Sequence, residues 1–256
     1  MIFTIAGKEL KALFASPLAW VVLTVVQIII AYAFLRRLDD FLQLQPQLIQ
    51  MANPPGATEL VAAPAFATAA AVFLFAVPLL AMRLIAEERR NQTLVLLVSA
   101  PVSMTEIVLG KFLGLMAFLA VIVALAALMP LSLAPATQLD YGLLASIVAG
   151  LVLLAACFAA VSLFVSSLTV HPAAAAIGAF AALLGMLLTG DVAGEGLKAR
   201  GWGVAANLAQ VFSPIRNFEP FGRGILDSYA IACSLLLTCA FLALAIRRLD
   251  GQRLRG

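Results

Sequence analysis

Several uninterrupted apolar runs, each about 20 residues long, constrain the fold of this chain more than any other feature. A helix of about 20 apolar residues crosses the roughly 30 Å hydrocarbon layer of a bilayer. Charged residues make up only 11% of the 256 residues, whereas about 25% is usual in a soluble domain. The runs are blocks of alanine, leucine and valine without the alternation of a membrane β-barrel. The sequence therefore predicts an all-α, polytopic membrane protein.

Six transmembrane helices fit these runs, and local signals set their ends. The predicted spans cover residues 18–35, 61–84, 107–131, 141–168, 172–188 and 228–246. Serine and aspartate are favoured N-caps, proline is favoured in the first turn, and Ser-x-x-Glu forms a capping box. These signals precede four of the spans: Ser16-Pro17, Ser103-Met-Thr-Glu106, Asp140 and Asp227. The whole chain, residues 1–256, is predicted to be a single transmembrane domain.

Three segments fall outside the predicted spans. Residues 2–15 form an amphipathic helix with Lys8, Glu9 and Lys11 opposite its apolar face, so residues 1–17 are predicted to be an interfacial elbow helix. Residues 36–60 hold Asn53-Pro54-Pro55-Gly56 and are expected to be a plain connector. Residues 189–227 are predicted to be an external interfacial segment with short helices, anchored by Trp202, Phe212, Phe218 and Phe221.

Lysine and arginine are distributed unevenly between the two ends of the predicted spans. The side with both termini and the loop after the second span holds ten of them and five acidic residues, a net charge of +5. The opposite side holds six against eight acidic residues, a net charge of −2. Because positive residues stay on the cytoplasmic side, both termini are predicted to be cytoplasmic. This topology accounts for the net positive charge of the chain, +3, without a nucleic-acid partner.

Motifs of nucleotide-binding and hydrolytic enzymes are missing from the sequence. It contains no Gly-x-x-x-x-Gly-Lys-Ser/Thr phosphate loop, no His-Glu-x-x-His and no Gly-x-Ser-x-Gly. We assign no catalytic, cofactor-binding or metal-binding residue, and we expect the single histidine, His171, to cap the fifth span. Almost no ionisable residue falls inside the spans, which argues against a proton-coupled transporter. Energy for any work must then come from elsewhere.

Small residues recur at a spacing of four, as in Gly110-x-x-x-Gly114 and Gly178-x-x-x-Ala182. This spacing lets membrane helices approach closely. The motif is compatible with a dimer face, and it is also frequent by chance in an alanine-rich chain.

A charged island, residues 83–111, separates the second and third spans. Glu87, Glu88, Arg89 and Arg90 extend the second span, and residues 94–98 form an apolar run too short to cross a membrane. Pro101 ends that run. The pattern predicts a short helix across the mouth of the bundle. It is either an interfacial re-entry loop or a helix that presents an apolar stripe to a soluble partner.

The island resembles the segment after the second span of ABC-2 type permeases. The resemblance lies in Arg83, Glu87-Glu88-Arg89, Thr93-Leu94, Ser99-x-Pro101-Val102-Ser103 and Gly110-Lys111. The start of the chain is similar to the same family through Lys8-Glu9-Leu10 and Ser16-Pro17-Leu18-Ala19-Trp20. The run Phe218-Glu219-Pro220-Phe221 before the last span is similar to the gliding-motility (GldF-like) branch of this family.

The resemblance implies the permease subunit of an exporter-type ABC transporter in the bacterial inner membrane. Two copies, or one copy and a related permease, would form the pathway among membrane lipids. Two cytoplasmic ABC ATPase subunits would bind the ATP and magnesium, and a periplasmic or membrane accessory protein is compatible with this architecture. Residues 84–106 would be the cytoplasmic coupling-helix region. Its ATPase-coupling interface would comprise Glu87, Glu88, Arg89, Arg90, Thr93, Leu94, Leu97, Ser99 and Pro101.

Two other functions stay open at the level of sequence. An ATP-driven complex could do mechanical or signalling work on an envelope protein without moving a solute, because few polar residues occur along the spans. An intramembrane enzyme is the third hypothesis, and no residue constellation supports it. For transport, the apolar spans favour a lipid-like or hydrophobic-peptide substrate over a sugar or an ion.

Overall fold

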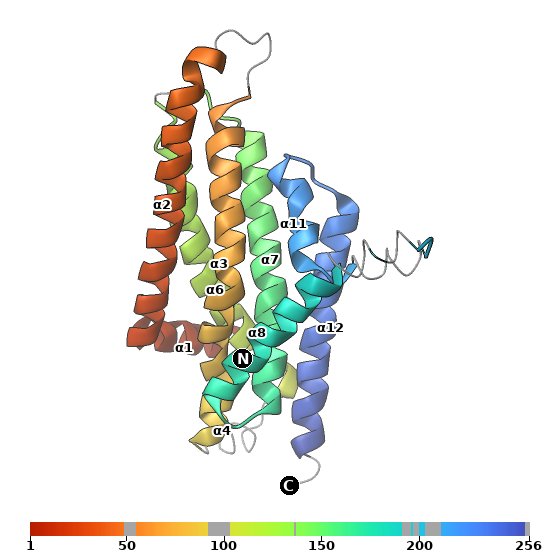
Figure 1. Cartoon of the computed structure of the whole chain (residues 1–256). Helices are drawn as coiled ribbons and strands as arrows, with labels where there is room; N and C mark the ends of the chain where they lie inside the picture. Colours follow the sequence, from red (N-terminus) through yellow and green to blue (C-terminus); the bar gives the residue numbers. More distant parts are fainter. Residues whose placement is uncertain are drawn as a thin grey trace.

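The computed structural model is a bundle of upright helices with one helix, α1 (Ile2–Ala15), lying across one end (Figure 1). It describes residues 1–48, 55–91, 103–135, 137–190, 196, 200–202 and 211–253. Every regular element in these ranges is helical, which confirms the predicted all-α class. We call one end of the bundle the base; it carries α1, α4 (Glu88–Arg90) and the C-terminal end of α12 (Ser228–Arg253).

Within the described ranges, five segments are long and apolar enough to cross a membrane, and a sixth apolar helix is shorter. The five are α2 (Pro17–Leu48), Thr58–Arg90, α6 (Met104–Leu131), α7 (Tyr141–Leu168) and α12; the shorter one is α8 (Pro172–Leu188). In the second segment, α3 (Ala63–Met82) lies between two π-helical turns, η1 (Thr58–Ala62) and η2 (Arg83–Glu87), and α4 follows. The bounds predicted for the fourth and fifth spans are those of α7 and α8.

α7 is the central helix of the bundle and contacts α3, α6, α8, α11 (Pro214–Gly222) and α12. Gly150 on α7 faces the ring of Phe221 on α11, and a β-carbon built on this glycine would lie 2.6 Å from that ring. Ala155 and Ala159 on α7 are buried as well. Small residues matter here, because lipid supplies little hydrophobic driving force between helices and close packing must hold them together.

Capping interactions predicted from the sequence are present at three helix starts. At α12, the Asp227 carboxylate accepts a hydrogen bond from the amide two residues further on, at 3.0 Å. At α6, the Ser103 hydroxyl accepts a hydrogen bond from the Glu106 amide at 3.2 Å, and the Glu106 carboxylate accepts one from the Ser103 amide at 3.1 Å. At α7, the Asp140 carboxylate accepts a hydrogen bond from the amide three residues further on, at 3.0 Å. His171 occupies the N-cap position of α8, as expected, and its side chain makes no capping hydrogen bond.

The first span is longer than predicted, because α2 continues to Leu48 where a connector was expected from residue 36. Leu38 and Phe41 pack against a small apolar cluster that contains Phe34 of the same helix and Val61 of η1. Positions 34, 38 and 41 follow helical spacing, so the apolar stripe of the span continues past its charged residues. At 1.5 Å per residue, this helix of 32 residues is about 48 Å long and exceeds the roughly 30 Å hydrocarbon layer.

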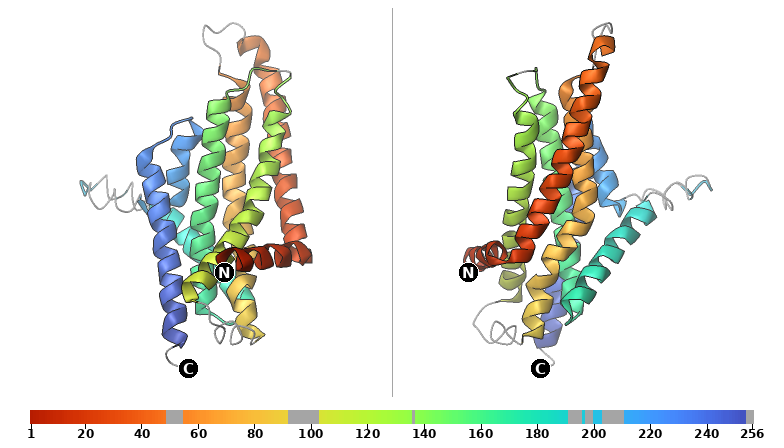
Figure 2. Two further views of the ribbon diagram at one scale, coloured as in Figure 1. Left: turned by 180° about the vertical axis from the view of Figure 1, so that it is seen from behind. Right: turned by 60° about the vertical axis from the view of Figure 1, so that its left-hand side comes forward.

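The α11 helix, between the fifth and sixth spans, packs into the bundle. α8 tilts away from the base, and α11 then rises beside α7 toward the opposite end (Figure 2). Phe218 and Phe221, which were expected to anchor at the membrane interface, are buried in the bundle at 6% and 1% exposure. Trp202 and Phe212 are exposed. The interfacial placement is therefore wrong for Phe218 and Phe221, because Gly150 lacks a β-carbon and leaves room for α11 against α7.

Candidate functional site

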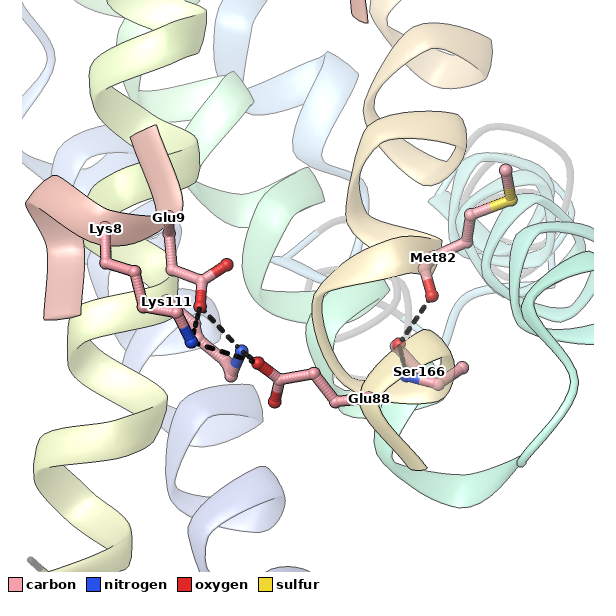
Figure 3. A network of polar contacts seen from close by, with 7 residues as sticks. Lys8, Glu9, Met82, Glu88, Lys111 and Ser166 are labelled. Carbon is pink, nitrogen blue, oxygen red and sulfur yellow. Dashed lines mark hydrogen bonds and ion pairs between the residues drawn. The ribbon is translucent and has the colours of Figure 1, made fainter. Parts of the chain in front are cut away.

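A buried ion cluster at the base joins three helices (Figure 3). The Nζ of Lys111 on α6 lies 2.9 Å from Oε1 of Glu9 on α1 and 2.8 Å from Oε1 of Glu88 on α4. The Lys111 side chain is 0% exposed and that of Glu9 is 9% exposed. Lys8, at 62% exposure, lies 4.0 Å from Glu9 and 3.8 Å from Glu88 on the outside of the cluster. We call these four residues the Lys111 cluster.

The cluster forms because α1 lies directly on the glycine face of α6. A β-carbon built on Gly110 would lie 2.7 Å from Ile5, and one built on Gly114 would lie 2.7 Å from the β-carbon of Glu9. The Gly110-x-x-x-Gly114 motif therefore permits close helix approach, as predicted, and α1 of the same chain covers it. Lys111 follows the first of these glycines directly and thus meets the carboxylate of Glu9.

The expected placement of Glu9 on the polar face of α1 is wrong. Glu9 stands four residues after Ile5 and four before Leu13, so these three side chains share one face of the helix. Glu9 and Leu13 are buried, whereas Lys8 and Lys11 are exposed. Buried charges require partners, and the ammonium of Lys111 supplies one for Glu9.

A second polar contact holds the π-helical turn η2 against α7 (Figure 3). The Ser166 hydroxyl on α7 accepts a hydrogen bond from the Ala86 amide at 3.1 Å and donates one to the Met82 carbonyl at 3.3 Å. π-Helical turns interrupt the regular helical ladder and are frequent at functional sites. Ser166 thus fixes the place where the second membrane segment changes its winding before α4.

Arg83 connects η2 to the junction between α1 and α2. Its Nε donates to Oε2 of Glu87 at 2.6 Å, and its Nη2 donates to Oε1 of the same carboxylate at 3.2 Å. Its Nη1 donates to the hydroxyl of Ser16. Ser16 was predicted to cap the first span, and its hydroxyl has this long-range partner. Such a two-point arginine–carboxylate contact fixes orientation as well as distance.

A charged cavity of about 240 Å³ separates α1 from the end of the second membrane segment. Its charged and polar lining comes from Lys8, Glu9, Ser16, Arg83, Glu87, Glu88 and Asn91. Among the residues that the structure describes, no group of three or more His, Cys, Asp or Glu side chains is placed to hold a metal ion. The arrangement holds α1, α4 and α6 together through ion pairs.

Four of the nine residues predicted for the ATPase-coupling interface lie within the described chain. Glu87 and Glu88 are partly buried and ion-paired, Arg89 is partly buried, and Arg90 is exposed at the end of α4. The remaining five lie outside the described residues: Thr93, Leu94, Leu97, Ser99 and Pro101. The short helix expected over residues 94–98 therefore stays a prediction.

Lys111 and Glu9 are the site residues that sequence reasoning missed. Lys111 lies within the third predicted span, residues 107–131, although that span was taken to be nearly free of ionisable groups. Two signals in the sequence pointed to the pair. Lys111 lies within the helix-packing motif Gly110-x-x-x-Gly114, and Glu9 stands on the same helix face as Ile5 and Leu13. Neither signal alone could pair two positions that stand 102 residues apart.

The fold and the charged base together define a polytopic helical membrane protein whose first helix, α1, is tied to its second and third membrane segments. The sequence matches the ABC-2 family transporter proteins over residues 3–252. The chain therefore belongs to the ABC-2 family, and it is a permease subunit of an ABC transporter. Permeases of this family associate with ABC ATPase partners and often dimerise. A search of curated proteins found no match.

Proposed function

We propose that this permease serves an exporter-type ABC transporter of the bacterial inner membrane, with its base in the cytoplasm and two ATPase subunits bound there. The end of the second membrane segment carries the proposal. It leaves the bundle at the base through Glu87, Glu88, Arg89 and the exposed Arg90, beside the charged cavity. A segment that docks on a soluble ATPase has to leave the membrane at that end.

The distribution of charge supports the cytoplasmic placement of the base. α1 contributes Lys8 and Lys11, and α12 contributes Arg247 and Arg248 near its C-terminal end. Positive residues beside membrane spans remain on the cytoplasmic side. Both termini are therefore cytoplasmic in this proposal.

Within this proposal, residues 84–106 are the coupling region, and α1 is the elbow helix in the membrane interface. The interface with the ATPase comprises Glu87, Glu88, Arg89, Arg90, Thr93, Leu94, Leu97, Ser99 and Pro101. The ATPase subunits bind ATP and magnesium, and a second copy or a related permease completes the pathway. The run Phe218-Glu219-Pro220-Phe221 favours the gliding-motility branch of the family. The apolar spans favour a lipid-like or hydrophobic-peptide substrate.

The test is co-purification of the ATPase with charge-reversed permeases. Arg90→Glu places an acid at the exposed end of α4, so we expect less ATPase bound per permease and a lower rate of ATP hydrolysis. Arg36→Glu is the matched control, since Arg36 is exposed on α2 some 20 residues above the base. Equal binding and equal hydrolysis by the two variants would contradict docking at the base.

Mechanical or signalling work on an envelope protein is the alternative use of the same complex. The long α2 helix favours it, because Leu42 and Leu44 are exposed where α2 projects beyond the membrane layer. Movement of lipid in vesicles that hold the permease–ATPase complex distinguishes the two functions. ATP-dependent movement supports export, and hydrolysis without any movement of lipid or peptide favours the alternative.

A further inference from the structure

We propose that Lys111 is the positioning residue for energy coupling in this permease. By holding Glu9 of α1 and Glu88 of α4 on one ammonium group, it makes α1, α4 and the start of α6 move as a single body. A push on the segment after α4 is then delivered to α1 and α6 as well as to α3. The inference rests on the proposed function, because the push has to come from a bound ATPase.

The degree of burial is the first argument. Lys111 has one of the largest fully buried side chains among the described residues, and Glu9 is nearly as buried. A buried ion pair is a weak source of stability, because a well-packed apolar replacement is often as stable or more so. In some proteins such a group instead fixes the relative position of the elements that carry the charges. The cluster is therefore better explained by positioning than by stability.

The geometry is the second argument. The Nζ of Lys111 is 2.9 Å from one carboxylate and 2.8 Å from the other, and both distances are those of charge-assisted hydrogen bonds. The two carboxylates come from helices that reach this point from different directions: α1 crosses the base, and α4 ends the upright second segment. One ammonium thus connects two elements that α6 alone would not hold together.

The neighbouring contacts determine where this body can move. The segment that carries Glu88 is attached to α3 through the π-helical turn η2, and Ser166 of α7 binds both ends of that turn. A π-helical turn has a less regular hydrogen-bond ladder than the α-helices on either side. When α1, α4 and the start of α6 move, the backbone therefore bends at η2. The hydrogen bonds of Ser166 to the Ala86 amide and the Met82 carbonyl are the contacts that change.

The first measurement is the distance between nitroxide labels at the exposed Thr4 and Asn91, made on the permease–ATPase complex with Cys239 replaced by alanine. The Thr4–Asn91 distance should stay the same with and without ATP in the wild-type complex, since α1 and α4 move together. In Glu9→Gln, which keeps the Lys111–Glu88 pair, the distance should broaden and change with ATP. A wild-type distance that changes with ATP would overturn the inference.

The second measurement is the effect of the permease on the rate of ATP hydrolysis. Lys111→Met leaves two carboxylates without their cation and can prevent folding, so Glu9→Gln, outside the proposed ATPase interface, is the main variant. We expect this variant to bind the ATPase in normal amount but to reduce the permease effect on hydrolysis about tenfold, a typical size for coupling between sites. Lys111→Arg should retain the permease effect on hydrolysis that Lys111→Met loses, because arginine keeps a cation between the two carboxylates.

Lys11→Gln is the matched control, since it removes one charge from an exposed position of α1, the helix that carries Glu9. It should leave both the label distances and the hydrolysis effect unchanged. Wild-type behaviour of Glu9→Gln in both measurements would overturn the positioning role while the proposed function stands. If the wild-type permease bound no ATPase at all, the proposed function itself would fail, and the coupling role with it.

Discussion

Gly114 on α6 lies so close to Glu9 on α1 that a β-carbon built on the glycine would fall 2.7 Å from the β-carbon of Glu9. The same β-carbon would lie 3.0 Å from the carbonyl oxygen of Ala6. Only glycine allows this approach without displacing the helix. The contact sets the depth at which α1 rests on α6, and therefore the position of the Glu9 carboxylate beside Lys111.

Gly114→Ala should push α1 away from α6 and lengthen the Glu9–Lys111 pair. Overpacking of this kind costs about 1–3 kcal/mol, so the thermal unfolding midpoint in detergent should fall. The control is Gly7→Ala on α1, where a β-carbon meets no atom within 4 Å. That variant should gain about 0.5 kcal/mol, because alanine is favoured over glycine within a helix. Equal midpoints for the two variants would show that α1 does not rest on Gly114.

Ser166→Ala should loosen the η2 turn. The substitution leaves the buried Ala86 amide without its serine partner, and an unsatisfied buried group costs about 1–3 kcal/mol. Amide hydrogen exchange at residues 82–88 should therefore become faster. Ser167→Ala is the adjacent control, because the Ser167 hydroxyl bonds only within its own helix, to Phe164. Faster exchange in both variants alike would argue against a specific clamp by Ser166.

Phe221→Ala should destabilise the packing of α11 on α7. Truncation of a buried phenylalanine costs about 3–5 kcal/mol, because it leaves a cavity. Phe212 is the control, since it stands nine positions earlier and is 50% exposed. Phe212→Ala should leave the unfolding midpoint within about 0.5 kcal/mol of the parent, as surface substitutions do. A midpoint that responds to Phe212 but not to Phe221 would contradict the packed position of α11.

The parts of the fold that depend on local sequence could be predicted, and those that depend on distant partners could not. The capping box of Ser103 with Glu106 and the Asp140 cap each involve residues three apart, so both were legible in the sequence. The extension of α2 was missed because its polar residues resemble a loop, while Leu38 and Phe41 find apolar partners on the next segment.

The site follows the same rule. Glu87, Glu88, Arg89 and Arg90 were predicted as a charged end of the second span, and the structure places them there at the base. The role of Glu88 as a partner of Lys111 depends on how α1 lies across α6. That arrangement involves residues about 100 positions apart, and no local pattern specifies it.

Site-specific photo-crosslinking from Asn91 in living bacterial membranes tests the central claim most directly. Asn91 directly follows α4 in the sequence, and it is exposed at the base. Benzophenone at this position should form a covalent adduct with an ABC ATPase subunit, and benzophenone at Arg36, about 20 residues along α2 from the base, should not. An ATPase adduct from Arg36, or none from Asn91 in a membrane where the complex is intact, would contradict coupling through the base.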